Sequence, residues 1–290
     1  MLFKGAATAV ITPFTKEGID FDNFSLQLDY QLNSGIEALV ICGTTGEAST
    51  MTEQERFDTI SFAVKKVNKK VPLIAGTGCN DTMHSVHLSK DAYKAGADAI
   101  LVTAPYYNKT SKKGLIEHFK TISSCVPIPL IMYNVPSRVG MNIDPDVMVT
   151  LAKCCNIIGV KECNLNQIAD IIDTAPEGFT VYSGDDSINL PALSLGAMGV
   201  VSVLSNVVPA HVVKMNRLFF ENRIEESRKL FYKTKNLTRL LFIETSPIPV
   251  KKAMQLMNMD SGMLRLPLVE MEEKSAGMLK DEMVSLGVIK

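Results

Sequence analysis

Eight apolar runs, each about as long as a β-strand, recur along the first 204 residues of this 290-residue chain. The segments between them show apolar residues three or four positions apart, as in Phe57, Ile60 and Val64, which indicates helices. Strands that alternate with helices form parallel sheets, and eight such units in about 220 residues predict a (β/α)8 TIM barrel of the α/β class, a fold of about 250 residues. A doubly wound open sheet is the alternative, but it usually has fewer strands. The eight runs are 6–12, 37–42, 71–76, 97–104, 128–134, 157–161, 179–183 and 199–204.

The last part of the chain has a different pattern. From residue 222 onward no run predicts a strand, and the segment reads as helices that are interrupted by Ser246-Pro247-Ile248-Pro249. We therefore predict a catalytic barrel over residues 1–221 and a C-terminal helical extension over residues 222–290.

Composition limits the partners that this chain can have. Hydrophobic residues make up 46% of the chain with no Trp, which suits the aliphatic core of a parallel sheet. A net charge of -1 gives no reason to expect nucleic acid or a membrane surface as a partner. The longest apolar stretches, such as 97–104, are too short to span a bilayer, and residues 1–5 lack the layout of a signal peptide. We therefore expect a cytoplasmic protein whose six cysteines are reduced.

Lys161 stands at the end of the apolar run Ile157-Ile158-Gly159-Val160. Burial of an unpaired ammonium costs several kcal/mol, so such a lysine tends to lose its proton, and the neutral amine is a nucleophile toward carbonyl carbon. A salt bridge between Lys161 and Glu162 or another acid is the alternative. The residue alone leaves both interpretations open.

Polar residues gather where six of the expected strands end. Active residues of a (β/α)8 barrel lie at the carboxyl ends of its strands and in the loops that follow. Each segment has an ordinary structural explanation, such as a tight turn, packing tyrosines or a solvated arginine, but together they predict a site that binds carboxylates. The segments are Gly43-Thr44-Thr45-Gly46-Glu47, Gly76-Thr77-Gly78, Ala104–Asn108, Tyr133–Arg138, Lys161-Glu162 and Ser183-Gly184-Asp185-Asp186.

Two missing patterns narrow the chemistry. The loops 183–186 and 205–208 are not the glycine-rich, cationic phosphate site of many barrels, which favours an unphosphorylated substrate. None of the four histidines ends an expected strand, which disfavours a zinc-dependent aldolase. Glu162, Asp185 and Asp186 could hold Mg²⁺, so a metal-dependent lyase stays as an alternative, although we expect no metal and no cofactor.

Taken together and in chain order, these segments resemble the dihydrodipicolinate synthase family, also called 4-hydroxy-tetrahydrodipicolinate synthases, within the pyruvate-dependent Schiff-base aldolase superfamily. The likeness covers essentially the whole chain, including Ser246–Lys251. It implies that Lys161 forms a Schiff base with pyruvate, and that the resulting enamine condenses with L-aspartate 4-semialdehyde. This reaction is the first committed step of lysine and diaminopimelate biosynthesis.

The resemblance also implies a role for each site residue. Tyr133 would shuttle protons, and Thr44 would link it to Tyr107 of a neighbouring chain. Such a shared relay implies a homo-oligomer, expected to be a tetramer built from dimers. Thr45 would bind the carboxylate of pyruvate, and Arg138 would bind that of the semialdehyde. The pocket backbone would come from Gly184 and Val201.

Arg138 separates the functional alternatives. The sialic-acid lyases of the superfamily lack an arginine at this point, so N-acetylneuraminate lyase or another pyruvate-dependent sugar-acid aldolase is the alternative function. A non-catalytic keto-acid sensor is a further one. The family's lysine-inhibited members bind lysine near positions that here hold Glu53, Arg56 and His84. Because Arg56 would repel the ammonium group of lysine, we predict weak or absent inhibition. The pair Cys154-Cys155 has no functional explanation beyond packing.

Overall fold

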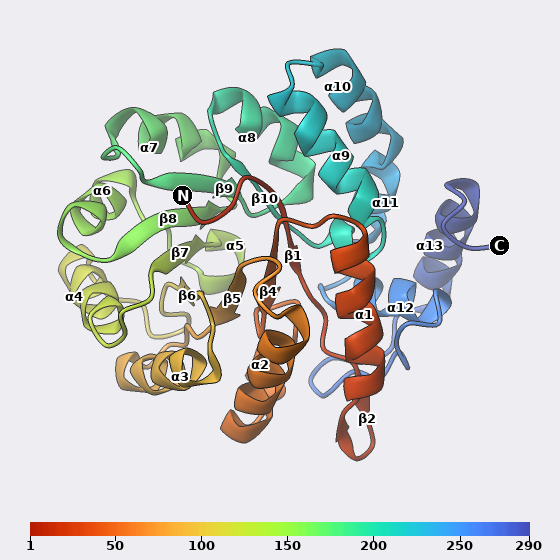
Figure 1. Cartoon of the computed structure of the whole chain (residues 1–290), viewed down its shortest axis with the longest axis horizontal. Coiled ribbons are helices and arrows are strands. Elements are labelled where there is room, and N and C mark those ends of the chain that lie inside the picture. Colours follow the sequence, from red (N-terminus) through yellow and green to blue (C-terminus); the bar gives the residue numbers. More distant parts are fainter.

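The computed structural model describes residues 1–290 and contains a closed barrel of eight parallel strands (Figure 1). The barrel closes because β1 pairs with both β4 and β10. The predicted fold class is confirmed, and each of the eight strands lies in one of the predicted apolar runs or within one residue of it. The barrel strands are β1 (Gly5–Ala9), β4 (Ala38–Ile41), β5 (Leu73–Gly76), β6 (Ala99–Thr103), β7 (Leu130–Asn134), β8 (Ile157–Glu162), β9 (Thr180–Ser183) and β10 (Gly199–Ser202).

Helices surround the barrel in the expected alternation with strands. The predicted helix around Phe57 is α2, and it begins with a capping box in which the Thr52 hydroxyl accepts from the Glu55 N–H while the Glu55 carboxylate accepts from the Thr52 N–H. The helices of this layer are α1 (Phe21–Asn33), α2 (Glu53–Val67), α3 (Thr82–Ala95), α4 (Lys112–Ser123), α6 (Pro145–Cys154), α7 (Ile168–Thr174), α8 (Asn189–Leu195) and α9 (Pro209–Phe220).

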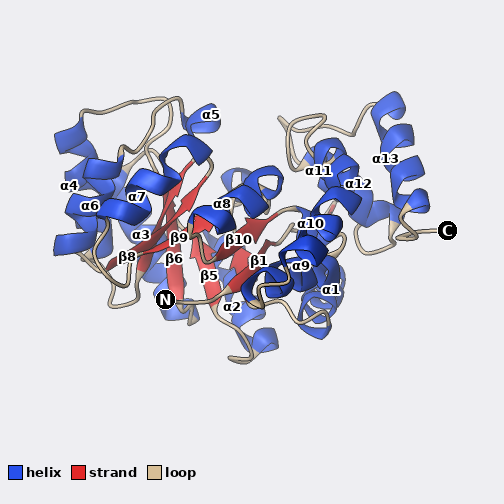
Figure 2. Ribbon diagram, turned by 90° about the horizontal axis from the view of Figure 1, so that it is seen from above, coloured by secondary structure: helices blue, strands red, loops and turns tan.

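Several short elements have no counterpart in the sequence prediction. A hairpin of two-residue strands, β2 (Phe14–Thr15) and β3 (Gly18–Ile19), lies between β1 and α1, and the one-turn helix α5 (Pro136–Val139) follows β7. Four single turns of 3₁₀-helix follow other barrel strands: Ala48–Thr50, Leu165–Gln167, Asp186–Ile188 and Leu204–Asn206. Figure 2 shows α5 on the side of the barrel opposite the N-terminus, where the strands end.

The chain after residue 222 is helical, as predicted. It forms α10 (Ile224–Lys233), α11 (Lys235–Leu240), α12 (Ile248–Leu256) and α13 (Glu273–Ser285), and the last three extend to one side of the barrel (Figure 2). Their buried residues, among them Leu237, Val250 and Leu279, belong to the same apolar core as the barrel strands. The division at residues 221 and 222 falls between α9 and α10 and stays a prediction. No helix is long and apolar enough to cross a membrane.

The register of β7 and β8 sets up the site. Tyr133 is the partner of Lys161, and Asn134 is the partner of Glu162. Paired residues point to the same face of a sheet, and successive residues point to opposite faces. The Tyr133–Lys161 pair therefore shares one face at the ends of these strands, and the Asn134–Glu162 pair shares the other.

Candidate active site

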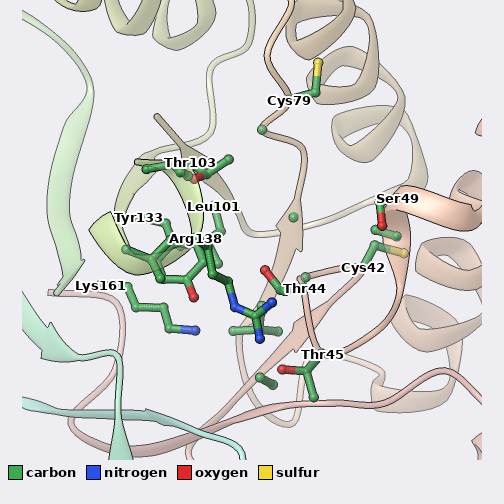
Figure 3. A pocket seen from close by; sticks show the side chains of 18 of the residues that line it. Cys42, Thr44, Thr45, Ser49, Cys79, Leu101, Thr103, Tyr133, Arg138 and Lys161 are labelled. Atoms are coloured by element: carbon green, nitrogen blue, oxygen red, sulfur yellow. The ribbon is translucent and has the colours of Figure 1, made fainter. Parts of the chain in front are cut away.

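A cavity of about 240 Å³ opens at the end of the barrel where the strands terminate. Its walls come from β1 and β4 to β8, from the loops after β4, β5 and β6, and from the start of α2 and the end of α5. In Figure 3, Lys161, Tyr133 and Arg138 point toward a common space, with Thr44 and Thr45 on its other side. The polar side chains of the lining are Thr44, Thr45, Ser49, Arg56, Thr103, Tyr106, Tyr133, Arg138 and Lys161.

Lys161 is a buried amine without an acidic partner. Its side chain is 5% exposed, and its Nζ lies 4.2 Å from the centroid of the Tyr133 ring. No carboxylate lies within 4.0 Å of this nitrogen. Burial lowers the pKa of Lys161; Cys163 and Asp186 oppose this change, and the charge of Arg138 reinforces it. The surroundings therefore favour the neutral, nucleophilic amine.

Glu162 does not pair with Lys161, because it points to the opposite face of β8. Its fully buried carboxylate accepts hydrogen bonds from Asn134 Nδ2 at 2.8 and 3.0 Å, from Gln167 Nε2 at 2.7 Å and from the Asn164 N–H at 2.7 Å. Burial raises the pKa of Glu162 to about 7, against the effect of these hydrogen bonds. The salt-bridge interpretation of Lys161 is therefore wrong for Glu162. This carboxylate instead ties the ends of β7 and β8 together, directly behind the Tyr133–Lys161 pair.

Tyr133 provides a protonated phenol beside the amine. Its side chain is 9% exposed. Burial raises the pKa of the phenol well above its usual value, Cys163 adds to this effect, and Arg138 and the Thr44 hydroxyl oppose it. A phenol held in this way can donate a proton to an oxygen that develops negative charge and can take it back later.

Arg138 gives the cavity a positive charge. It lies in α5, and its Nη2 donates to the carbonyl oxygen of Ser246 at 2.9 Å, which leaves other N–H groups of the guanidinium free to bind a ligand. No acidic side chain lines this cavity. A site with arginine and lysine and without carboxylates is suited to a substrate that carries carboxylate groups.

Gly184 and Val201 flank the site without lining the cavity. A Cβ atom at Gly184 would lie 2.5 Å from Cys163 Sγ and 3.1 Å from Lys161 Cγ, so only glycine fits beside the lysine. Val201 is buried in β10, next to Ala7 of β1.

Tyr107 lies outside the cavity of this chain. Its side chain is 93% exposed, and its backbone has a φ of 69°, a left-handed conformation that is uncommon for a non-glycine residue. The preceding residue, Tyr106, lines the cavity instead. Among the predicted site residues, the structure therefore brings together Lys161, Tyr133, Thr44, Thr45 and Arg138.

Several lining residues were not expected at the site, among them Arg56, Cys42 and Cys79. Arg56 of α2 reaches the cavity and donates from Nη2 to the carbonyl oxygen of Gly76 at 2.7 Å, although the sequence analysis considered it only as a group that opposes lysine inhibition. Cys42 and Cys79 also line the cavity. The apolar run that ends at Cys42 and the Gly76–Gly78 segment before Cys79 were the available signals.

A buried ion pair anchors the threonine loop, the segment Gly43-Thr44-Thr45-Gly46-Glu47 that follows β4. Lys251 of α12 donates from Nζ to Glu47 Oε1 at 2.8 Å and to the Thr12 carbonyl oxygen at 2.9 Å, and it also contacts the Met263 carbonyl oxygen. Both charged side chains are 0% exposed. Because Glu47 ends the segment that carries Thr44 and Thr45, the C-terminal extension helps to hold that segment at the cavity.

Comparisons with known proteins place the chain in one family. A sequence model of the dihydrodipicolinate synthetase family matches residues 2–285. The 4-hydroxy-tetrahydrodipicolinate synthase of Acetivibrio thermocellus is 50% identical over 288 residues, which cover 99% of each chain. The crystal structure of dihydrodipicolinate synthase from Aquifex aeolicus superposes with a TM-score of 0.97 at 41% identity over 99% of each chain. A structure described as the first monomeric dihydrodipicolinate synthase variant has a TM-score of 0.98 at 38% identity, over 99% of this chain and 98% of that one. The chain therefore belongs to the dihydrodipicolinate synthetase family.

Proposed function

We propose that this protein is a 4-hydroxy-tetrahydrodipicolinate synthase, a Schiff-base lyase that condenses pyruvate with L-aspartate 4-semialdehyde. Its product enters lysine and diaminopimelate biosynthesis. The observation that carries this proposal is the buried Lys161 amine, which lacks an acidic partner and lies 4.2 Å from the Tyr133 ring at the mouth of the barrel. The names of full-length relatives at about half sequence identity support the same activity.

The first half of the reaction activates pyruvate. The neutral amine of Lys161 attacks the ketone carbon, and loss of water gives a protonated imine. This cation withdraws electrons from the methyl group, which passes a proton to the Tyr133 phenolate left by loss of water and becomes the enamine carbon nucleophile. Tyr133 donates a proton to the departing oxygen, and the Thr45 segment, which lines the cavity, holds the carboxylate of pyruvate.

The second half joins the two substrates. The enamine carbon attacks the aldehyde carbon of the semialdehyde, while the phenol of Tyr133 protonates the new alkoxide. Arg138 binds the carboxylate of the semialdehyde and so places the aldehyde over the enamine. Attack of the substrate's amino group on the imine carbon then closes the ring and releases Lys161.

Tyr107 enters the site in an oligomer. We place it as the last member of a proton relay through Thr44 to Tyr133, contributed by a neighbouring chain. Its 93% exposure in the single chain and its absence from the cavity lining support a role in contacts between chains. The assembly is a homotetramer built from such dimers. Sedimentation analysis of the wild type and of Tyr107→Ala tests this assignment, because a monomeric wild type with full activity contradicts it.

Reductive trapping tests the central step. Incubation with pyruvate and borohydride should reduce the imine and leave a stable adduct on Lys161, which peptide mass mapping locates. Lys251 is the matched control because it is also buried, but it is held in an ion pair with Glu47 and should stay unlabelled. An adduct at another lysine, or none at residue 161, overturns the proposal. An adduct that forms without turnover of the semialdehyde would instead favour a sugar-acid aldolase or a keto-acid sensor.

A further inference from the structure

Cys154 and Cys155 are adjacent thiols at the end of α6 that the proposed reaction does not use. Their Sγ atoms lie 3.3 Å apart. Cys154 is exposed and Cys155 is partly exposed, so reagents in solution can reach the pair. All six cysteines of the chain are free thiols.

A direct disulfide is a poor fit for adjacent residues. Consecutive Cα atoms lie about 3.8 Å apart across a trans peptide bond, whereas disulfides usually join Cα atoms about 4.4–6.8 Å apart. A strained disulfide is easily reduced, so the pair tends to remain a dithiol. One bridging atom that bonds to both sulfurs needs no direct sulfur–sulfur bond and can use the 3.3 Å separation.

We propose that Cys154 and Cys155 form a vicinal dithiol site that captures trivalent arsenicals, with one arsenic atom bonded to both sulfurs. An organic arsenic oxide, R–As=O, loses its oxygen as water, which carries away the two thiol protons. Two S–As bonds form, two S–H bonds and the As=O bond break, and arsenic stays trivalent. The step therefore needs no oxidant or reductant.

The surroundings of the pair keep its sulfurs in the thiol form. Burial raises the pKa of Cys155, and its Cys154 neighbour adds to this, whereas Ser123 and Lys120 of α4 oppose the change. The net change is upward, so the pair meets the reagent as two thiols, which is the form that the condensation with R–As=O consumes. Chelation makes the capture strong, because the second S–As bond forms within a single molecule.

The site is separate from the catalytic cavity. Cys155 lies just before β8 begins at Ile157, while Lys161 lies near the other end of that strand. The other four thiols compete for the same reagent. Cys42 and Cys79 are buried and line the cavity, and Cys125 and Cys163 are partly exposed. A correct test must therefore locate the adduct and not only detect it.

Phenylarsine oxide is the probe, added in equimolar amount to the full-length protein with an excess of 2-mercaptoethanol. Intact mass should show one phenylarsenic group per chain, and peptide mapping should place it on Cys154 and Cys155. A small dithiol should remove it, because only another chelator competes with a chelate. Cys154→Ser and Cys155→Ser should each lower the retained label by roughly 10²-fold, since each leaves a single thiol that the monothiol strips.

Cys125→Ser is the matched control, because Cys125 is partly exposed but has no adjacent thiol, and it should keep the full label. The proposal is overturned by an adduct on any of the other four cysteines, by label that survives in both single variants, or by no label in the presence of the monothiol. The wild-type peptide map decides the question even if a variant fails to fold.

Discussion

Two lysines are buried near the mouth of this barrel, and only one has the surroundings of a nucleophile. Lys161 is 5% exposed and Lys251 is 0% exposed. Each Nζ lies over an aromatic ring, at 4.2 Å from the Tyr133 centroid and at 4.4 Å from that of Phe14. Lys251 donates to the Glu47 carboxylate and to two carbonyl oxygens, whereas Lys161 has no carboxylate within ion-pair distance. Burial and an aromatic neighbour do not distinguish the two lysines; the oxygen acceptors do.

The contrast explains how one fold uses the same residue type for two purposes. A buried ammonium is tolerated when a carboxylate and carbonyl oxygens replace its water shell, and it then holds structure together. Without those acceptors the proton is held weakly, and the amine becomes reactive. Variants of the two lysines test this difference in hydrogen-bond acceptors directly, and variants of Glu162 and Arg138 test the groups around Lys161. The expected effects run from the largest to the smallest.

Replacement of Lys161 should abolish catalysis without loss of stability. We expect Lys161→Met to lower kcat/KM by roughly 10⁴-fold or more, the scale of losing a nucleophile. The lowered pKa means that the folded protein binds this proton less tightly than the unfolded chain, so the amine destabilises the fold below the unfolded pKa. The Tm of the variant at neutral pH should therefore stay the same or rise. A stable variant that retains appreciable turnover of both substrates contradicts the assignment.

Replacement of Lys251 should have the opposite pattern. Lys251→Met leaves the Glu47 carboxylate buried without its cation, and the free energy of unfolding should fall by about 3–5 kcal/mol. Urea unfolding measures this loss. The matched control is Lys252→Met, because the next lysine is only partly buried and contacts Gln255 Oε1, so its effect should stay within about 0.5 kcal/mol. Similar losses in the two variants would argue against the ion pair as an anchor.

Glu162 should make stability depend on pH. Its folded pKa of about 7 lies above the ordinary value of 4.5, so the folded state binds more protons between these values. The contribution of this group is therefore fully present below about pH 4.5 and is lost as the pH rises through 7, on the order of 3 kcal/mol in total. Glu162→Gln removes the titration. Urea unfolding of both proteins between pH 5 and 8 should give a difference that changes with pH, and parallel curves would exclude the effect.

Arg138 should select the second substrate. Loss of a charge-assisted hydrogen bond of about 1.5–3 kcal/mol should lower kcat/KM for aspartate semialdehyde about ten- to a hundredfold in Arg138→Ala. A neutral sugar aldehyde should be affected much less, because it has no carboxylate for the guanidinium to bind. Rates with both aldehydes provide the internal control. Equal losses would remove Arg138 from its role in binding the carboxylate.

The parts of the fold that the sequence predicted are those with a local signal. Parallel strands buried on both faces appear as continuous apolar runs, so all eight were found. The hairpin β2–β3 was not predicted because two-residue strands are too short to show a pattern, and α5 was not predicted because Pro136–Val139 is a single turn.

Site residues at or near the ends of strands were predictable from the sequence. Residues placed by loop conformation or by long-range contacts were not. Tyr133 and Lys161 lie at the ends of apolar runs and Arg138 follows one, and all three line one cavity, as expected from a barrel. Which of Tyr106 and Tyr107 faces inward depends on the left-handed backbone at Tyr107, which no sequence pattern signalled. The Glu47–Lys251 pair joins residues 204 positions apart, and nothing local marks either as the partner of the other.

The Glu47–Lys251 ion pair has a consequence for folding during translation. Every barrel strand is synthesised before residue 251, so a nascent barrel carries an acid in the threonine loop whose counter-charge has not yet emerged. The catalytic mouth can acquire its final shape only after α12 has been translated and docked. A nascent chain that ends before α12 would therefore have its sheet in place while the threonine loop at the catalytic site is not yet anchored.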